Sequence, residues 1–90
     1  MYGSANRDDA HFAGADTFDV GRANARTHLA FGQGPHFCVG AALARLEGRI
    51  ALEETFKRFP TWDVDPGGVV RQHTSTVRGY SQVRIRPTDG

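Results

Sequence analysis

The spacing of apolar residues predicts one long helix in the middle of the chain. Val39, Leu43, Leu46 and Ile50 recur at the three- and four-residue intervals that place side chains on one helical face. No proline interrupts the stretch between positions 36 and 59, and its residues other than glycine are good helix formers. Because Pro60 disfavours helical backbone before it, the pattern predicts a helix over about 39–58.

The opposite side of the predicted helix is apolar as well. Its residues are mostly small: Ala41, Ala44, Gly48, Ala51, Leu52, Thr55 and Phe59. Charged residues fill the two flanks, where Glu53–Lys57 and Glu54–Arg58 have the spacing of helical ion pairs. A helix that is apolar on two faces is normally enclosed by other parts of a larger body. We therefore expect more protein around this helix than 90 residues can supply.

The flanking regions follow other patterns. Residues 1–30 have no sustained period and are interrupted by Gly, Ser, Asn and Asp, which predicts an irregular segment, here called the meander. After the helix, residues 61–65 alternate in polarity and reach Pro66–Gly67–Gly68, which we interpret as a turn. Residues 69–86 predict a β-hairpin or two short strands, so that strands span 61–86, and residues 87–90 are expected to fray. We expect one partial domain over residues 1–90.

Composition supports the interpretation that the chain needs something to pack against. Leu, Ile, Val and Phe contribute 19 of 90 residues, close to the level at which burial no longer offsets the entropy of ordering. A partner chain, a missing part or a large apolar cofactor would each serve. Basic and acidic residues are mixed at a net charge of +1, which favours neither nucleic acid nor a membrane surface as partner. Without a long apolar run or a leader pattern, we expect a soluble, cytoplasmic protein.

Cys38 is the residue with the most informative surroundings. It precedes the predicted helix, where free backbone N–H groups and the helix dipole favour a negatively charged sulfur, the form that binds metals. Gly34 and Gly40 allow the main chain to approach a planar group closely. Because Cys38 is the only cysteine, the chain can form neither an internal disulfide nor a multi-cysteine zinc site.

Other interpretations of residues 31–40, here called the cysteine loop, remain open at this point. The loop could be a plain glycine-rich turn before a buried helix. His36 and Cys38 could form a nucleophile pair, although no orienting third group is evident. A zinc site of His28, His36 and Cys38 lacks a fourth ligand, and no Lys-Ser/Thr follows to complete a phosphate loop.

The cysteine loop resembles the haem-loop signature of the cytochrome P-450 family, F-x-x-G-x-[HR]-x-C-x-G. The match continues through Leu43–Ala44–Arg45, and further similarities surround it: Ala5–Asn6–Arg7–Asp8, Phe18–Asp19 with Arg22, His28–Leu29–Ala30–Phe31–Gly32, and Phe59–Pro60. His36 and the H-L-A-F-G lead-in are typical of soluble bacterial members. The resemblance covers essentially this whole chain but only the C-terminal quarter or so of such an enzyme. It implies a C-terminal fragment of the mainly α cytochrome P-450 fold.

The resemblance also implies roles for individual residues. Cys38 would be the proximal thiolate ligand of haem b (iron protoporphyrin IX), and Phe31 would pack near the sulfur and shield it. His36 would hydrogen-bond a haem propionate, unless it is simply an exposed loop histidine. Gly34 and Gly40 would shape the loop, and Ala44 would be the small residue where the helix passes close to the porphyrin, unless it is simply a good helix former. Val77 would be a weak candidate for a substrate contact, and a core position is the alternative.

The implied activity is that of a haem-thiolate monooxygenase, which inserts one atom of O₂ into a small organic substrate with electrons from a ferredoxin-type partner. That partner would dock around the cysteine loop, where Arg45 and Arg49 are possible contacts. The alternative is a truncated, catalytically inactive piece that binds haem loosely or serves as an interaction module. A start at Met1 within an element favours truncation.

Several features of the family are absent from this chain. No Glu has an Arg three residues later, so the E-x-x-R helix is expected upstream of Met1, as are the long central helix and the upstream propionate contacts. Ala13–Thr17 spells A-G-x-D-T, the oxygen-activation motif of that central helix, but Phe12, Phe18 and Gly21 leave no room for a long helix, and we interpret the match as coincidence. Thr17 stands where many members have an arginine, and whether Arg22 replaces it is open.

Overall fold

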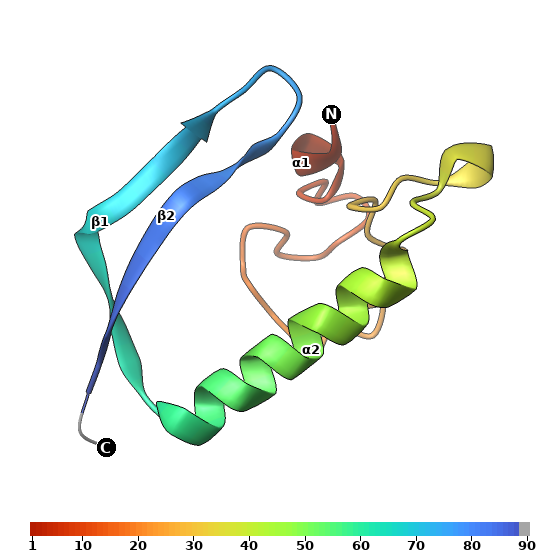
Figure 1. Cartoon of the computed structure of the whole chain (residues 1–90). Coiled ribbons are helices and arrows are strands. Elements are labelled where there is room, and N and C mark those ends of the chain that lie inside the picture. Colours follow the sequence, from red (N-terminus) through yellow and green to blue (C-terminus); the bar gives the residue numbers. More distant parts are fainter. Residues whose placement is uncertain (89–90) are drawn as a thin grey trace. The chain divides into compact units, whose positions relative to one another are not determined.

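The computed structural model describes residues 1–88, which divide into two compact units, residues 1–45 and residues 46 onward (Figure 1). The elements in chain order are α1 (Tyr2–Ala5), two 3₁₀ turns (Ala25–Thr27 and Gly34–His36), α2 (Ala41–Arg58), β1 (Trp62–His73) and β2 (Arg78–Pro87). No helix in the described part of the chain is long and apolar enough to cross a membrane. The expectation of a single partial domain stays a prediction.

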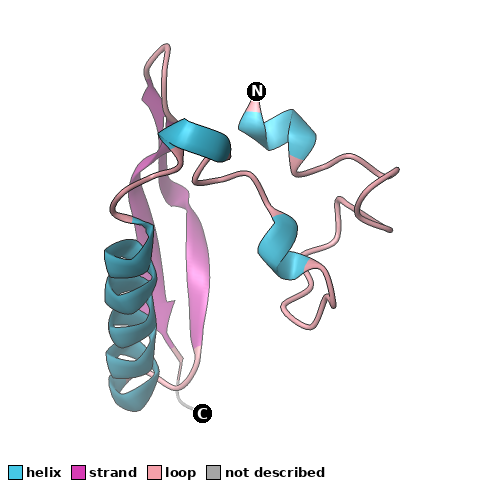
Figure 2. Ribbon diagram, turned by 90° about the vertical axis from the view of Figure 1, so that its right-hand side faces the viewer, coloured by secondary structure: helices cyan, strands magenta, loops and turns pink. Residues whose placement is uncertain are grey.

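The meander is irregular, as its sequence predicts (Figure 2). Besides α1 and one 3₁₀ turn, it consists of turns that are fixed by side chains bonding to backbone. The amide of Asn24 donates to the carbonyl of His11 at 3.0 Å, and the His11 ring lies 2.8 Å from the Thr27 hydroxyl. Phe12 is buried at the centre of these turns. The sequence shows no period here because polar side chains, rather than a repeating backbone ladder, hold the segment.

Helix α2 confirms the predicted long helix but begins two residues later than predicted. The N–H of Ala41 donates to the carbonyl of Cys38, and the N–H of Ala44 donates to the carbonyl of Gly40 at 2.8 Å. Residues 39 and 40 therefore belong to the loop. The predicted ion pairs Glu53–Lys57 and Glu54–Arg58 are wrong, because the structure pairs Lys57 with Glu54 and Arg49 with Glu53.

Both apolar faces of α2 are exposed within the described chain. Leu43, Leu46 and Ile50 on one face are 45–58% exposed, and Leu52 on the other is 57% exposed. Burying a side chain of this size stabilises a protein by roughly 1.5–3 kcal/mol, so leaving all of them in water is costly. Residues 1–88 do not cover either apolar face of α2, and the expectation of a larger enclosing body stays a prediction.

Strands β1 and β2 form one antiparallel hairpin, and the turn predicted at Pro66–Gly68 is wrong. Pairing runs from Trp62↔Pro87 through Val64↔Ile85, shifts register before Val69↔Val83, and continues to His73↔Arg78. Residues 66–68 therefore form an irregularity inside one long strand, a place where Pro and Gly are tolerated in sheets. The actual turn lies at Thr74–Val77, where the Thr74 hydroxyl both donates to and accepts from the backbone of Val77.

Two further expectations concern this unit. Val77 is 56% exposed in the hairpin turn, and both interpretations of it, as a substrate contact or as a core residue, stay predictions. Residues 87 and 88 are not frayed, because Pro87 ends β2 and the N–H of Thr88 donates to the carbonyl of Thr61 at 3.0 Å. The rest of the expected frayed tail, residues 89–90, lies outside the described residues.

Candidate functional site

The cysteine loop is closed by one backbone hydrogen bond. The N–H of Cys38 donates to the carbonyl of Phe31 at 2.9 Å. Inside this closure the N–H of Phe37 donates to the carbonyl of Gly34 at 3.0 Å, which completes the 3₁₀ turn Gly34–His36. The carbonyl of Cys38 then accepts from Ala41, the first residue of α2. Cys38 is thus held through both its N–H and its carbonyl, with the loop on one side and the helix on the other.

Two glycines give the loop its path. Gly32 has a φ of +77° and Gly34 a φ of +78°, in the left-handed region that residues with a Cβ rarely adopt. No atom lies within 4 Å of a Cβ placed at Gly34, so the backbone angle rather than crowding favours glycine there. The expectation that Gly34 shapes the loop therefore has a physical basis in its conformation.

The Cys38 side chain is exposed and surrounded by exposed apolar groups. Phe37 is 47% exposed and Val39 is fully exposed. A Cβ placed at Gly40 would lie 3.9 Å from the Cys38 sulfur, so Gly40 is its close neighbour in the structure. A thiol at the start of a helix, among side chains that water solvates poorly, forms a surface suited to a large apolar ligand.

Phe31 contacts several residues of the cysteine loop and its surroundings. Its ring lies 6.3 Å from the Phe37 ring and 5.7 Å from the His28 ring, and the Arg45 guanidinium sits over its face at 5.0 Å. A cation above an aromatic face is favourable. Phe31 is half-buried by these neighbours, and its carbonyl holds Cys38. The expected contact of its ring with the sulfur stays a prediction.

The remaining predicted site residues lie on or next to the same loop. His36 ends the 3₁₀ turn with an exposed ring, Gly34 begins that turn, and Gly40 leads into α2. Ala44 lies in the first turn of α2 and is exposed. The structure therefore gathers all six predicted residues within one loop and one helical turn, although their roles toward a cofactor stay predictions.

The zinc alternative gains no support from the described residues. Among residues 1–88, no three His, Cys, Asp or Glu side chains come close enough together to hold a metal ion. Any metal bound at Cys38 would therefore need its other ligands from outside this set of side chains.

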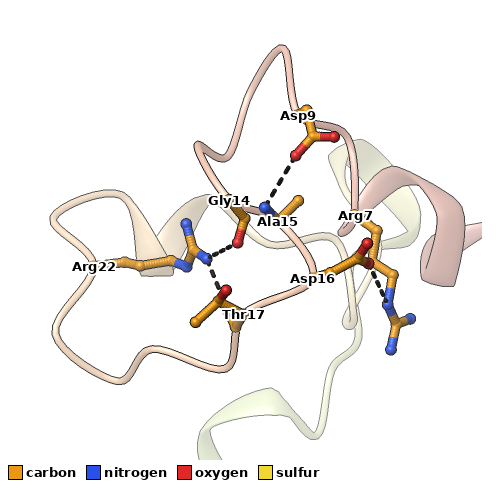
Figure 3. A network of polar contacts seen from close by, with 7 residues as sticks. All are labelled: Arg7, Asp9, Gly14, Ala15, Asp16, Thr17 and Arg22. Carbon is orange, nitrogen blue, oxygen red and sulfur yellow. Dashed lines mark hydrogen bonds and ion pairs between the residues drawn. The ribbon is translucent and has the colours of Figure 1, made fainter.

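Arg22 clamps the segment that spells A-G-x-D-T (Figure 3). Its guanidinium donates to the carbonyls of Gly14 and Thr17 at 2.6 and 2.8 Å. It also donates to the carbonyl of Ala13 at 2.5 Å. The segment is a tight turn with Gly14 at φ +61°, not part of a long helix, which confirms the interpretation as coincidence. The guanidinium is largely engaged by its own loop, where Asp9 also accepts from the N–H of Ala15.

Sequence reasoning missed two residues that contact the lead-in of the cysteine loop. The side-chain oxygen of Asn6 accepts a hydrogen bond from the N–H of Leu29 at 2.8 Å, and the hydroxyl of Tyr2 lies over Gly32. In the sequence, Asn6 is noticeable only as part of the A-N-R-D stretch that resembles the family, and nothing there indicates its contact with Leu29. An asparagine directly after a short helix is the available signal, but its partner lies 23 residues away and cannot be read from spacing.

Comparison with known proteins decides the family. The family model described as Cytochrome P-450 matches residues 1–85. The chain belongs to the cytochrome P-450 family. It is 46% identical over 83 residues to a Mycobacterium tuberculosis relative with the name cytochrome P-450 123, a match that covers 92% of this chain and 21% of the relative. It is 44% identical over 86 residues to 6-deoxyerythronolide B hydroxylase of Saccharopolyspora erythraea, covering 93% and 21%.

Solved structures show the same fold. The hydroxylase HmtN, involved in himastatin biosynthesis, superposes with a TM-score of 0.87 at 39% identity, over 98% of this chain and 24% of that chain. The helix followed by a two-stranded hairpin is therefore a C-terminal part of the cytochrome P-450 fold, as predicted. The chain spans about a fifth of the length of the curated relatives it matches.

The family has a haem cofactor, and the residues around Cys38 fit such a group. Such a group would need a donor atom that is free, and the Cys38 sulfur is exposed. It also needs apolar surface beside that donor, which the side chains of Phe37 and Val39 provide.

Proposed function

We propose that this chain is the cysteine-ligand segment of a haem-thiolate monooxygenase, in which Cys38 binds the iron of haem b. The observation that carries the proposal is the bond from Cys38 to the Phe31 carbonyl, which closes the loop and leaves the sulfur exposed at the start of α2. The names of relatives such as 6-deoxyerythronolide B hydroxylase support an oxidation reaction. When bound, a thiolate-ligated haem supplies the chemistry that activates O₂.

The residues of the chain have distinct tasks in this proposal. Cys38 would supply the thiolate that holds the iron, and the carbonyl of Phe31 accepts the Cys38 N–H and keeps the loop closed. His36, at the exposed end of the 3₁₀ turn, donates a hydrogen bond to a propionate. Gly34, Gly40 and Ala44 leave room for a flat macrocycle beside the main chain. The apolar side chains at positions 37 and 39 exclude water from the sulfur.

The parent enzyme acts on a small organic substrate and receives electrons from a ferredoxin-type partner in the cytoplasm. The chain supports a docking role for one arginine in particular. Arg45 lies at the edge of a shallow hollow with Arg26 and His28, close to the cysteine loop, and none of the ion pairs within residues 1–88 engages Arg26 or Arg45. Two arginines without a carboxylate partner among residues 1–88, on the unit that carries the cysteine loop, suit an acidic electron-transfer protein. Arg49 is less suited, since Glu53 pairs with it.

A second proposal concerns the 90 residues by themselves. Both faces of α2 are exposed, and the chain covers about a fifth of its relatives. We expect the isolated chain to be catalytically inactive, because it contributes surface on only one side of the cofactor. Ferrous carbon-monoxide spectroscopy checks this: the thiolate band that gives the family its name is expected to be absent from the isolated chain reconstituted with haem.

The proposed role of Cys38 is testable in a chimera. In the chimera this chain replaces the matching C-terminal segment of 6-deoxyerythronolide B hydroxylase, to which it is 44% identical. The unmodified chimera is expected to show the thiolate band. Cys38→Ser is expected to abolish it, whereas Ala42→Ser, which adds a hydroxyl on the exposed side of the first turn of α2, is expected to retain it. A thiolate band in the Cys38→Ser chimera would exclude Cys38 as the ligand.

A further inference from the structure

Residues 2–6 reach the lead-in of the cysteine loop at two points. The side-chain oxygen of Asn6 accepts the N–H of Leu29 at 2.8 Å. The hydroxyl of Tyr2 lies over Gly32, where a Cβ would be 3.4 Å from the oxygen. Gly32 also has a positive φ of +77°, which residues with a Cβ rarely adopt, whereas the distance to the Tyr2 hydroxyl is an ordinary contact. Residues at the start of the chain therefore contact both Leu29 and Gly32, the two ends of the stretch 29–32.

From Leu29 a short series of backbone bonds leads to Cys38. The carbonyl of Leu29 accepts the N–H of Gly32 at 2.9 Å, which turns the chain toward the loop. The carbonyl of Phe31, inside that turn, accepts the N–H of Cys38 at 2.9 Å. The peptide groups on both sides of Leu29 are thus fixed, one by Asn6 and one by the turn that presents the Phe31 carbonyl.

The hydrogen bond between Asn6 and Leu29 is expected to affect the structure of the loop strongly. Asn6 and Leu29 are both half-buried, so water replaces a lost partner poorly. An amide N–H left unsatisfied in such a place is more costly than the bond itself is favourable. The bond also joins positions 23 residues apart, which fixes the entry of the loop relative to α1 rather than relative to its own neighbours.

We propose that Asn6 is a positioning residue for the iron ligand: by holding Leu29 it fixes the Phe31 carbonyl and, through it, the orientation of Cys38. The consequence for haem ligation rests on the proposed function. Asn6 does not touch the cofactor or the sulfur. Its removal is expected to loosen the loop so that Cys38 samples orientations in which thiolate ligation to iron is lost.

The test uses the chimera with three variants. Asn6→Leu keeps the size of the side chain and removes the acceptor, and Asn6→Asp keeps an acceptor oxygen. Asn24→Leu is the matched control, because the Asn24 side chain also bonds a backbone group of the meander, the carbonyl of His11 at 3.0 Å, and forms no hydrogen bond with residues 29–38. The readout is the fraction of reduced carbon-monoxide complex that retains the thiolate band.

Asn6→Leu is expected to lower that fraction at least twofold, Asn6→Asp to restore most of it, and Asn24→Leu to leave it unchanged even if the protein becomes less stable. Amide hydrogen exchange is the second readout. Asn6→Leu is expected to speed exchange at Leu29 about tenfold or more and to speed exchange at Cys38 as well.

Two results would overturn the proposal. One is an unchanged thiolate fraction together with unchanged exchange at Cys38 in Asn6→Leu. The other is a loss of thiolate ligation in Asn24→Leu as large as in Asn6→Leu, which would show a general loss of stability. If the unmodified chimera lacks the thiolate band, the proposed function fails, and exchange at Leu29 and Cys38 still tests the coupling from Asn6 separately.

Discussion

The meander with its cysteine loop and the β1–β2 hairpin are stabilised in different ways. Side chains that bond to distant backbone groups hold the first, as with Arg22 on three carbonyls and Asn6 on Leu29. A ladder of backbone pairs holds the second, from Trp62↔Pro87 to His73↔Arg78. A ladder does not depend on side-chain identity, whereas each side-chain clamp does. Substitutions in the meander should therefore cost more than substitutions in the hairpin, except where backbone packing itself requires glycine.

The largest effect on the free energy of unfolding is expected at Gly68 in the hairpin, where close packing requires glycine. In Gly68→Ala, the new Cβ would collide with the side chain of Arg84 on the facing strand. Because the clash involves atoms next to the backbone, we expect a loss of about 3 kcal/mol in the free energy of unfolding, measured by urea denaturation of the chimera. Gly67→Ala is the control, since its Cβ would meet only the carboxylate oxygen of Asp65 at 3.4 Å. Equal effects of the two substitutions would contradict the close approach of Arg84 to Gly68.

The next effect should come from the meander. Arg22→Gln is expected to lower the free energy of unfolding by about 2 kcal/mol, because three carbonyls lose charge-assisted donors. Arg71→Gln, at an exposed position of β1, is expected to change it by less than about 0.5 kcal/mol. The same denaturation experiment checks both. If Arg71→Gln lowered the free energy of unfolding as much as Arg22→Gln, the two regions would not differ in how they are stabilised.

Gly34→Ala tests the effect of backbone conformation in the cysteine loop without a change in packing. No atom would contact the new Cβ, but φ is +78°, so we expect a loss of about 1 kcal/mol and a weaker thiolate band. Gly79→Ala in β2 also meets no atom within 4 Å and has no positive φ, so little change is expected. Thermal unfolding and carbon-monoxide spectra of both variants provide the measurement. A harmless alanine at position 34 would show that the loop does not need left-handed backbone there.

The smallest effect is expected at the open end of the hairpin. Thr88→Val removes the hydroxyl that donates to Thr61 at 2.8 Å but keeps the backbone bond between the two residues. Because the site is exposed to water, the expected loss is about 0.5 kcal/mol or less by urea denaturation. A loss above about 1 kcal/mol would mean that side chains clamp the hairpin too.

The sequence predicts α2 and the six residues around Cys38 because those signals are local. Helical spacing from Leu43 to Ile50 needs no information beyond the stretch itself, and the cysteine loop is specified within ten positions. The hairpin turn is misplaced by sequence reasoning because Pro66–Gly67–Gly68 has the composition of a turn, whereas Thr74–Val77 is closed by one threonine hydroxyl. Whether a proline-glycine stretch turns or bulges depends on the facing strand, here on Arg84 opposite Gly68.

The clamps of the meander lie beyond sequence reasoning for the same reason. Asn6 and Arg22 look like ordinary polar loop residues until their acceptors are known. The partner of Asn6 is 23 residues away, and the three acceptors of Arg22 are backbone carbonyls, which carry no sequence signature. Such contacts become visible only when the chain is folded.

The closure of the cysteine loop by a bond between residues only seven apart has a kinetic consequence. Bringing together two groups at such a short separation has a small entropic cost and occurs on a timescale far shorter than that of folding. The loop that carries the Cys38 sulfur can therefore close before haem binds. Under the proposed function, haem then binds to a loop that has already formed.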